Sequence, residues 1–228
     1  EHAVFAFQRV LHGAGIPLTL YPGADVHLSQ DMMGRIQDQK ACTLNNQGKY
    51  ILIELPSHSV PGRVEDELFE LKINGITPII THPERNPMIQ KDPDLLYQWI
   101  QKGALAQVTA MSVIGDFGEM VGQSARTLLA RRLVQVIASD AHSARDRPPC
   151  LLDAVQEAAQ ILHNEKEARQ MVLDRPAAML AGRPCPVPEP VDVSHRKRGA
   201  AWGSMLRVWD RMITRTGQPP QIPPKYPY

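Results

Sequence analysis

An apolar run that ends in one polar side chain occurs at residues 77–82, which read Thr77-Pro78-Ile79-Ile80-Thr81-His82. The pattern recurs at residues 50–54, which end in Glu54, and at residues 134–142, where Asp140 and His142 follow the apolar run. Asp25 follows a fourth run, at residues 18–24. Continuous apolar runs are typical of strands that are buried on both faces of a parallel sheet. The sequence therefore predicts an α/β fold whose strands end in acidic and histidine side chains.

Helix and strand patterns alternate along the chain. Apolar residues recur three and four positions apart, as on one face of a helix, in residues 4–13, 63–74, 94–102, 118–131, 149–163 and 165–181. Short apolar runs predict five strands, at residues 18–20, 50–55, 77–80, 105–109 and 134–138. Five strands alone would leave a sheet open, with exposed edges.

Composition narrows the class of protein. The chain has 228 residues, 43% of them hydrophobic, which is enough for a substantial core. No apolar run reaches the roughly 18 residues of a membrane span. Three widely spaced cysteines, an odd number, argue against a disulfide framework and for a reducing, cytoplasmic location. None has an arginine six positions later, which excludes the usual loop of the cysteine phosphatases.

Charge and proline content change at residue 183. Residues 183–228 hold eight Lys and Arg against three Asp and Glu, and nine of the twenty prolines. We therefore predict a globular body at residues 1–182 and a basic, Pro-rich tail at residues 183–228, with a short amphipathic helix at residues 200–215. The tail could attach to an acidic membrane surface or a kinase partner. Nucleic-acid binding has little support, because the excess positive charge is confined to the tail.

The polar residues at the strand ends predict a metal site. Buried carboxylates are costly unless they are paired or bound to metal. Each such residue alone is more often a cap or a turn residue, but four strands behaving alike favour one shared site. Carboxylate oxygens and imidazole nitrogens suit Mn, Zn, Fe or Mg. His27 and His58 are outside candidates because they lie near strand ends, and we expect the remaining histidines to be surface or packing residues: His2, His12, His163 and His195.

Two arginines lie close to the predicted ligands. Arg85 is three residues after His82, and Arg147 is five residues after His142. A planar, permanently charged guanidinium group suits bidentate binding of phosphate. The alternative for Arg85 is a salt bridge with Glu84 or Asp92. Phosphate binding is the better hypothesis because both arginines flank the predicted metal site.

Several blocks of the chain resemble a known family, the bacterial PHP-type protein-tyrosine phosphatases of the CpsB/CapC/YwqE group, where PHP stands for polymerase and histidinol phosphatase. The resemblance runs from about residue 4 to residue 182. Its specific blocks are Thr81-His82-Pro83-Glu84-Arg85-Asn86 and Ser139-Asp140-Ala141-His142 with Arg147-Pro148-Pro149. Gly115-Asp116-Phe117-Gly118 fits the family in the same order.

The resemblance implies a distorted, seven-stranded α/β barrel with two or three metal ions, commonly Mn. The residues that correspond to the family's metal ligands are Asp25, Glu54, His82, Asp140 and His142. Arg85 and Arg147 correspond to arginines that bind phosphate and stabilise the transition state. The implied substrate is phosphotyrosine on a tyrosine autokinase that controls capsular or exopolysaccharide synthesis. The implied chemistry is attack of metal-activated water on phosphorus, without a cysteinyl intermediate.

The chain departs from the family pattern in two ways. The Asp-x-His-x-His segment that opens the family and a later Thr-Pro-His segment are both absent from these 228 residues. We therefore expect either an N-terminally truncated domain that lacks the first one or two strands, or a degraded homologue. In both cases we expect an exposed sheet edge and weak or no activity. The position of Asp25 is usually Glu, which is longer by one methylene group.

Two other functions stay open at this point. One is another PHP phosphoesterase, similar to histidinol-phosphate phosphatase. The other is a non-catalytic module that binds phosphate but lacks a full ligand set. The sequence leaves the oligomeric state open.

Overall fold

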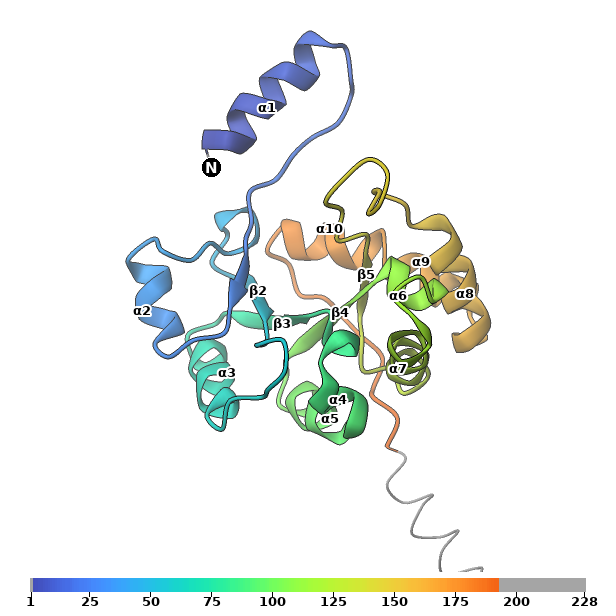
Figure 1. Ribbon diagram of the computed structural model, residues 1–228. Helices are drawn as coiled ribbons and strands as arrows, with labels where there is room; N and C mark the ends of the chain where they lie inside the picture. Colours follow the sequence, from blue (N-terminus) through green and yellow to red (C-terminus); the bar gives the residue numbers. More distant parts are fainter. Residues whose placement is uncertain (1, 193–228) are drawn as a thin grey trace, which may run out of the picture. The chain divides into compact units, whose positions relative to one another are not determined.

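The structure is a computed structural model that describes residues 2–192. Within these residues the strands form one parallel sheet (Figure 1). Its strands are β1 (Asp25–His27), β2 (Tyr50–Glu54), β3 (Thr77–Thr81), β4 (Leu105–Thr109) and β5 (Val136–Ala138). They lie side by side in chain order, and each neighbouring pair is parallel. This confirms the predicted α/β fold. Within residues 2–192 the sheet is open, with β1 and β5 at its edges, so the closed barrel stays a prediction.

Helices connect and cover the strands. They are α1 (His2–Gly13), α2 (Met32–Gln37), α3 (Val64–Ile73), α4 (Pro87–Lys91), α5 (Asp94–Gln101), α6 (Ala110–Ile114), α7 (Glu119–Ala130), α8 (Leu152–Leu162), α9 (Glu165–Gln170) and α10 (Asp174–Leu180), with 3-10 turns η1 (Leu44–Asn46) and η2 (Pro83–Arg85). Five of the six predicted helices are confirmed with shifts at their ends. The sequence pattern did not predict α2, α4 and α6, because five or six residues are too few to show a repeating apolar face.

The two faces of the sheet bury different sets of side chains, as expected from the twofold alternation along a strand. One face packs against α3, α5, α7 and α8, through strand residues that include Ile51, Ile53, Ile80, Val108 and Ile137. The opposite face packs against Met179 of α10, through Tyr50, Ile79, Leu105 and Val136. Burial on both faces is what the continuous apolar runs predicted.

The helix predicted over residues 165–181 is wrong as a single element. The structure breaks it into α9 and α10. Pro176 explains the break, because proline has no amide hydrogen to donate to the carbonyl of Val172 and its ring clashes with that carbonyl in a continuous helix. Pro176 is tolerated where it lies, in the first turn of α10.

The strand predicted over residues 18–20 is also wrong, and β1 begins at Asp25 instead. The backbone of residues 18–20 forms hydrogen bonds with the side chain of Gln8 instead of with a neighbouring strand. Its Nε2 donates to the Leu18 carbonyl at 2.7 Å, and its Oε1 accepts from the Leu20 amide at 2.7 Å. With Leu18 exposed, this apolar run does not join the sheet.

Residues 183–192 contain neither helix nor strand. Cys185 and Val187 pack against the cluster of Tyr50 and Met179, so this part of the predicted tail covers one face of the sheet. The boundary at residue 183 stays a prediction, and the helix predicted at residues 200–215 lies outside the described residues. None of the helices in residues 2–192 has the length and apolarity needed to cross a membrane.

Gln135, at the entry to β5, is 1% exposed and bonds to the backbone of its neighbours. Its Oε1 accepts from the Ala106 amide at 2.8 Å, and its Nε2 donates to the Arg132 carbonyl at 3.1 Å. Because Gln135→Ala leaves the buried Ala106 amide unpaired, we expect urea unfolding to show a loss of about 1–3 kcal/mol in the free energy of unfolding. The exposed control Gln156→Ala should change it by less than about 0.5 kcal/mol. Equal losses in both variants would contradict this role.

Candidate active site

The carboxyl ends of β1, β2 and β3 lie next to one another, on the side of the sheet where its strands end. His27 is in register with Glu54, and Ile53 is in register with Ile80, two residues before His82. Parallel strands in chain order bring their ends to the same side, which is where α/β folds build functional sites. The structure thus brings together three of the predicted ligands, Asp25, Glu54 and His82.

His82 lies at the centre of this group. Its backbone turns out of β3 in the left-handed region (φ 34°, ψ 50°), and its amide donates to the Gln107 carbonyl of β4 at 2.8 Å. Its Nε2 lies 3.5 Å from Asp25 Oδ2 and 3.5 Å from Glu54 Oε1. The side chain of His82 is 12% exposed, so the imidazole is held inside the site and its Nε2 faces both carboxylates.

The two carboxylates have further partners. Thr81 is buried, and its hydroxyl donates to Asp25 Oδ1 at 2.9 Å. His27 Nδ1 lies 2.8 Å from Glu54 Oε2. The sequence marked His27 only as an outside candidate. The sequence did contain evidence for placing His27 in the site. Residues two apart in a strand lie on the same face, and His27 is two residues after Asp25.

The donor set of Asp25, Glu54 and His82 fits a divalent cation in its chemistry. Ligands bound at about 2.1 Å to one metal ion lie about 3.0–3.4 Å apart, close to the 3.5 Å separations of His82 Nε2 from the two carboxylates. Within residues 2–192, however, no three His, Cys, Asp or Glu side chains stand already arranged to hold a metal ion. The described residues thus supply suitable donors without completing a coordination sphere.

The pKa of His82 is raised above its ordinary value. Burial by itself lowers it, as does the positive charge of Arg85, but the interaction of the imidazole with Asp25 outweighs both, with a smaller contribution from Glu84. Protonated His82 is therefore the form that the carboxylates stabilise when no metal is bound.

A second group lies at the ends of β3 and β5 and consists of Arg85, Arg147 and Asp140. Arg85 Nη1 donates to Asp140 Oδ2 at 3.0 Å, and Arg147 Nη2 donates to the same oxygen. The guanidinium carbons of Arg85 and Arg147 lie over the ring of Phe117, 5.5 Å and 5.6 Å from its centroid. The two arginine side chains are 35% and 23% exposed. An anion from solvent can therefore reach two adjacent guanidinium groups.

Asp140 and His142 are predicted ligands that the structure places in this second group. Asp140 has a positive φ of 50°. His142 Nδ1 lies 2.8 Å from the Asp140 carbonyl, and its side chain is 59% exposed. Among the described residues, no hydrogen bond or ion pair joins Asp140 or His142 to Asp25, Glu54 or His82. Their role as ligands therefore stays a prediction.

The alternative salt bridges of Arg85 are not found. Glu84 is fully buried, and its Oε1 accepts from the Thr109 amide at the end of β4, at 3.1 Å. Asp92 Oδ1 accepts from the Asp94 amide at 3.1 Å. Complete burial raises the pKa of Glu84, against opposing interactions with Ser112 and Thr109. Sequence reasoning missed Glu84 as the anchor of the turn between His82 and Arg85, because a charged residue beside an arginine normally predicts a surface pair.

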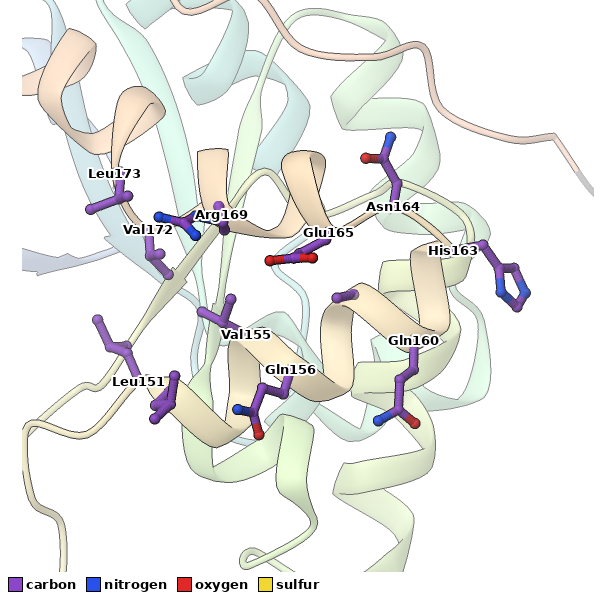
Figure 2. Close-up of a pocket in the computed structure, with 12 residues that line it drawn as sticks. Leu151, Val155, Gln156, Gln160, His163, Asn164, Glu165, Arg169, Val172 and Leu173 are labelled. Atoms are coloured by element: carbon purple, nitrogen blue, oxygen red, sulfur yellow. The ribbon is translucent and has the colours of Figure 1, made fainter.

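The other candidates lie apart from these two groups. His58 is exposed and makes no hydrogen bond or ion pair with the described residues. A groove of about 750 Å³ lies between α8 and α9 (Figure 2), and its lining includes Leu151, Val155 and Leu173. It contains none of the predicted site residues, so we place the candidate site at the strand ends.

Comparison with known proteins gives an independent line of evidence. The model of the family described as "Capsular polysaccharide synthesis, CpsB/CapC" matches residues 1–181. CapC from Staphylococcus aureus is 38% identical over 131 residues, which are 58% of this chain and 51% of CapC. The tyrosine-protein phosphatase YwqE from Bacillus subtilis is 35% identical over 150 residues, which are 66% of this chain and 57% of YwqE. The chain thus spans about half the length of these curated relatives.

The fold is similar to a solved one. A chain from the crystal structures of YwqE from Bacillus subtilis and CpsB from Streptococcus pneumoniae, described there as unique metal-dependent tyrosine phosphatases, superposes with a TM-score of 0.80 and 27% sequence identity. The match covers 85% of this chain and 77% of that one.

We expect His82 of the metal-free protein to titrate above about 6.5, the ordinary value for histidine, and Asp25→Asn to lower its pKa. Imidazole NMR signals followed against pH in the presence of a chelator measure this. Because the folded pKa is raised, the Asp25–His82 interaction stabilises the fold below pH about 6.5 and is lost as pH rises through the folded pKa. Asp25→Asn should therefore cost more stability at acidic pH than at alkaline pH. The exposed control Asp38→Asn should not shift His82, and an unshifted His82 in Asp25→Asn would contradict the assignment.

Proposed function

Because the chain belongs to the CpsB/CapC family of capsular polysaccharide synthesis, we propose that it is a metal-dependent protein-tyrosine phosphatase. One observation carries the proposal. Arg85 and Arg147 both donate to Asp140, at the carboxyl ends of the strands. At the same ends, Asp25 and Glu54 face His82. Metal donors beside paired guanidinium groups are what hydrolysis of a phosphate monoester requires.

Asp25, Glu54 and His82 would hold the metal, and by family resemblance Asp140 and His142 would join them. Divalent ions held there would supply Lewis-acid chemistry, which activates water and neutralises phosphate charge. Two or three Mn²⁺ ions are the proposed occupants. Thr81 and His27 would keep Asp25 and Glu54 turned toward the site through the contacts they already make.

Arg85 and Arg147 would bind the phosphoryl group. Asp140 Oδ2 accepts from both guanidinium groups. An oxygen of phosphate can accept from the same two groups in the same way. In the reaction the oxygen of water bonds to phosphorus and the water gives up one proton. The bond between phosphorus and the tyrosine oxygen breaks, and the tyrosine oxygen takes up one proton, so that tyrosine and inorganic phosphate are the products. The two arginines stabilise the negative charge that spreads over the phosphoryl oxygens.

The proposed substrate is phosphotyrosine on a bacterial tyrosine autokinase that controls capsular or exopolysaccharide synthesis, in the cytoplasm. The proposed architecture is a distorted barrel of seven strands, of which residues 2–192 provide five. Residues 1–182 would form the phosphatase domain, and residues 183–228 the basic tail.

A second candidate function is a phosphate-binding module without activity. The observation that favours it is the lack, within residues 2–192, of a finished arrangement of metal ligands. Another PHP phosphoesterase, similar to histidinol-phosphate phosphatase, is the closer alternative. A panel of phosphotyrosine peptide, phosphoserine peptide and histidinol phosphate, each with and without Mn²⁺, separates the three. Turnover of the first substrate alone supports the phosphatase, and phosphate binding without any turnover supports the module.

His82→Ala should abolish binding of Mn²⁺, because it removes the only nitrogen donor that faces both Asp25 and Glu54 among the described residues. Calorimetric titration with Mn²⁺ measures this without relying on activity. The matched control His12→Ala changes an exposed histidine on α1 and should bind as the unchanged chain does. Equal Mn²⁺ affinity in both variants would argue against this metal site.

If the unchanged chain hydrolyses a phosphotyrosine peptide, Arg147→Ala should lower its kcat/KM by about a hundredfold or more, the usual effect of removing one donor to a developing negative charge. The control is Arg145→Ala, two residues away in the same loop and exposed. We expect it to keep nearly full activity. If the two variants were equally active, Arg147 would have no role in the reaction.

A further inference from the structure

Phe117 projects from a turn whose backbone is fixed. The turn joins α6 to α7, and it is flanked by Gly115 (φ 90°) and Gly118 (φ 93°, ψ 164°). The second of these conformations is essentially restricted to glycine. The Gly118 amide donates to the Gly115 carbonyl at 2.9 Å, and the Asp116 amide donates to the Met111 carbonyl at 2.9 Å. The ring therefore leaves a defined point on the surface.

The ring of Phe117 is not part of the hydrophobic core. It is half-buried, and it belongs to neither of the two clusters of buried apolar side chains. Its charged contacts are instead the two guanidinium groups, at 5.5 Å for Arg85 and 5.6 Å for Arg147. Arg85 comes from the turn after β3 and Arg147 from the loop after β5. One ring thus connects two arginines that enter the site from separate parts of the chain.

Two guanidinium groups that share one carboxylate oxygen repel each other, and the single charge of Asp140 offsets only one of their two charges. The face of an aromatic ring carries negative electrostatic potential and attracts a cation within about 6 Å. Phe117 meets this distance for both arginines. Unlike a second carboxylate, the ring attracts the cations without competing for their hydrogen bonds, which leaves the N–H groups available to an anion.

We propose that Phe117 is a positioning residue that holds Arg85 and Arg147 side by side, so that both bind one phosphate group. The inference rests on the proposed function for its substrate, a phosphate monoester. It assigns to Phe117 a role through the arginines, with no contact between Phe117 and the reacting atoms.

The test is calorimetric titration of the full chain with inorganic phosphate, with and without Mn²⁺. Phe117→Leu keeps an apolar side chain of similar size but removes the ring, and it should weaken phosphate binding about 5- to 30-fold, the loss of two modest cation–π contacts. Phe117→Tyr keeps the ring and should bind phosphate within about twofold of the unchanged chain. The control Met120→Leu changes an exposed apolar residue three positions away and should have no effect.

A double-mutant cycle shows whether Phe117 acts through an arginine. In an Arg147→Ala background, Phe117→Leu should weaken phosphate binding by clearly less than it does alone, because one of its two partners is gone. Thermal unfolding of each variant shows whether it still folds. The proposal is overturned if Phe117→Leu binds phosphate as the unchanged chain does, if Phe117→Tyr binds as weakly as Phe117→Leu, or if the two changes are additive.

Failure of this inference differs from failure of the proposed function. If the unchanged chain binds phosphate in a way that depends on Phe117 but hydrolyses no phosphotyrosine peptide with Mn²⁺, the positioning role stands and the phosphatase proposal fails. If the chain hydrolyses the peptide, and Phe117→Leu has the same KM and the same phosphate affinity, the phosphatase stands and the positioning role fails. An unchanged chain that binds no phosphate overturns the positioning role whatever the hydrolysis assay gives.

Discussion

The structure depends on parallel pairing of consecutive strands, because that pairing places the ends of β1, β2 and β3 next to one another. The side chains of Asp25 and Glu54 stay 34% and 28% exposed, whereas that of His82 is only 12% exposed, so the imidazole needs partners within the site. Two neighbouring residues at the end of β3 make these contacts. The Thr81 hydroxyl donates to Asp25, and His82 Nε2 faces both Asp25 and Glu54. Two partly exposed carboxylates that face one buried imidazole form a donor set that suits a cation.

The turn that follows β3 links the two halves of the site. His82 leaves the strand in a left-handed conformation, and two residues later Glu84 is buried against the Thr109 amide of β4. This contact fixes the direction in which Arg85 leaves the turn, toward Asp140 at the end of β5. Residues 82–85 thus place an imidazole among carboxylates and a guanidinium beside a second arginine. Both arginines lie over the ring of Phe117, from the α6–α7 turn.

The sequence predicted the parts of this arrangement that depend on periodicity. Apolar runs located β2, β3, β4 and β5, and their polar ends located Glu54, His82 and Asp140. The prediction from sequence failed where a single residue interrupts a regular element or occupies its hydrogen bonds. Gln8 bonds the backbone of residues 18–20, so a run with strand character stays outside the sheet. Pro176 divides a periodic helix. The pairing of Arg85 with Asp140 depends on tertiary approach over 55 residues, which no local pattern encodes.

The central claim is that the strand-end carboxylates and His82 form a metal site beside a pair of phosphate-binding arginines. Anomalous diffraction at the manganese edge, from crystals of the chain soaked with Mn²⁺ and inorganic phosphate, tests it most directly. The account predicts a manganese peak bounded by Asp25, Glu54 and His82, with phosphate within hydrogen-bond distance of Arg85 and Arg147. Manganese bound elsewhere, or phosphate that contacts neither arginine, would contradict it.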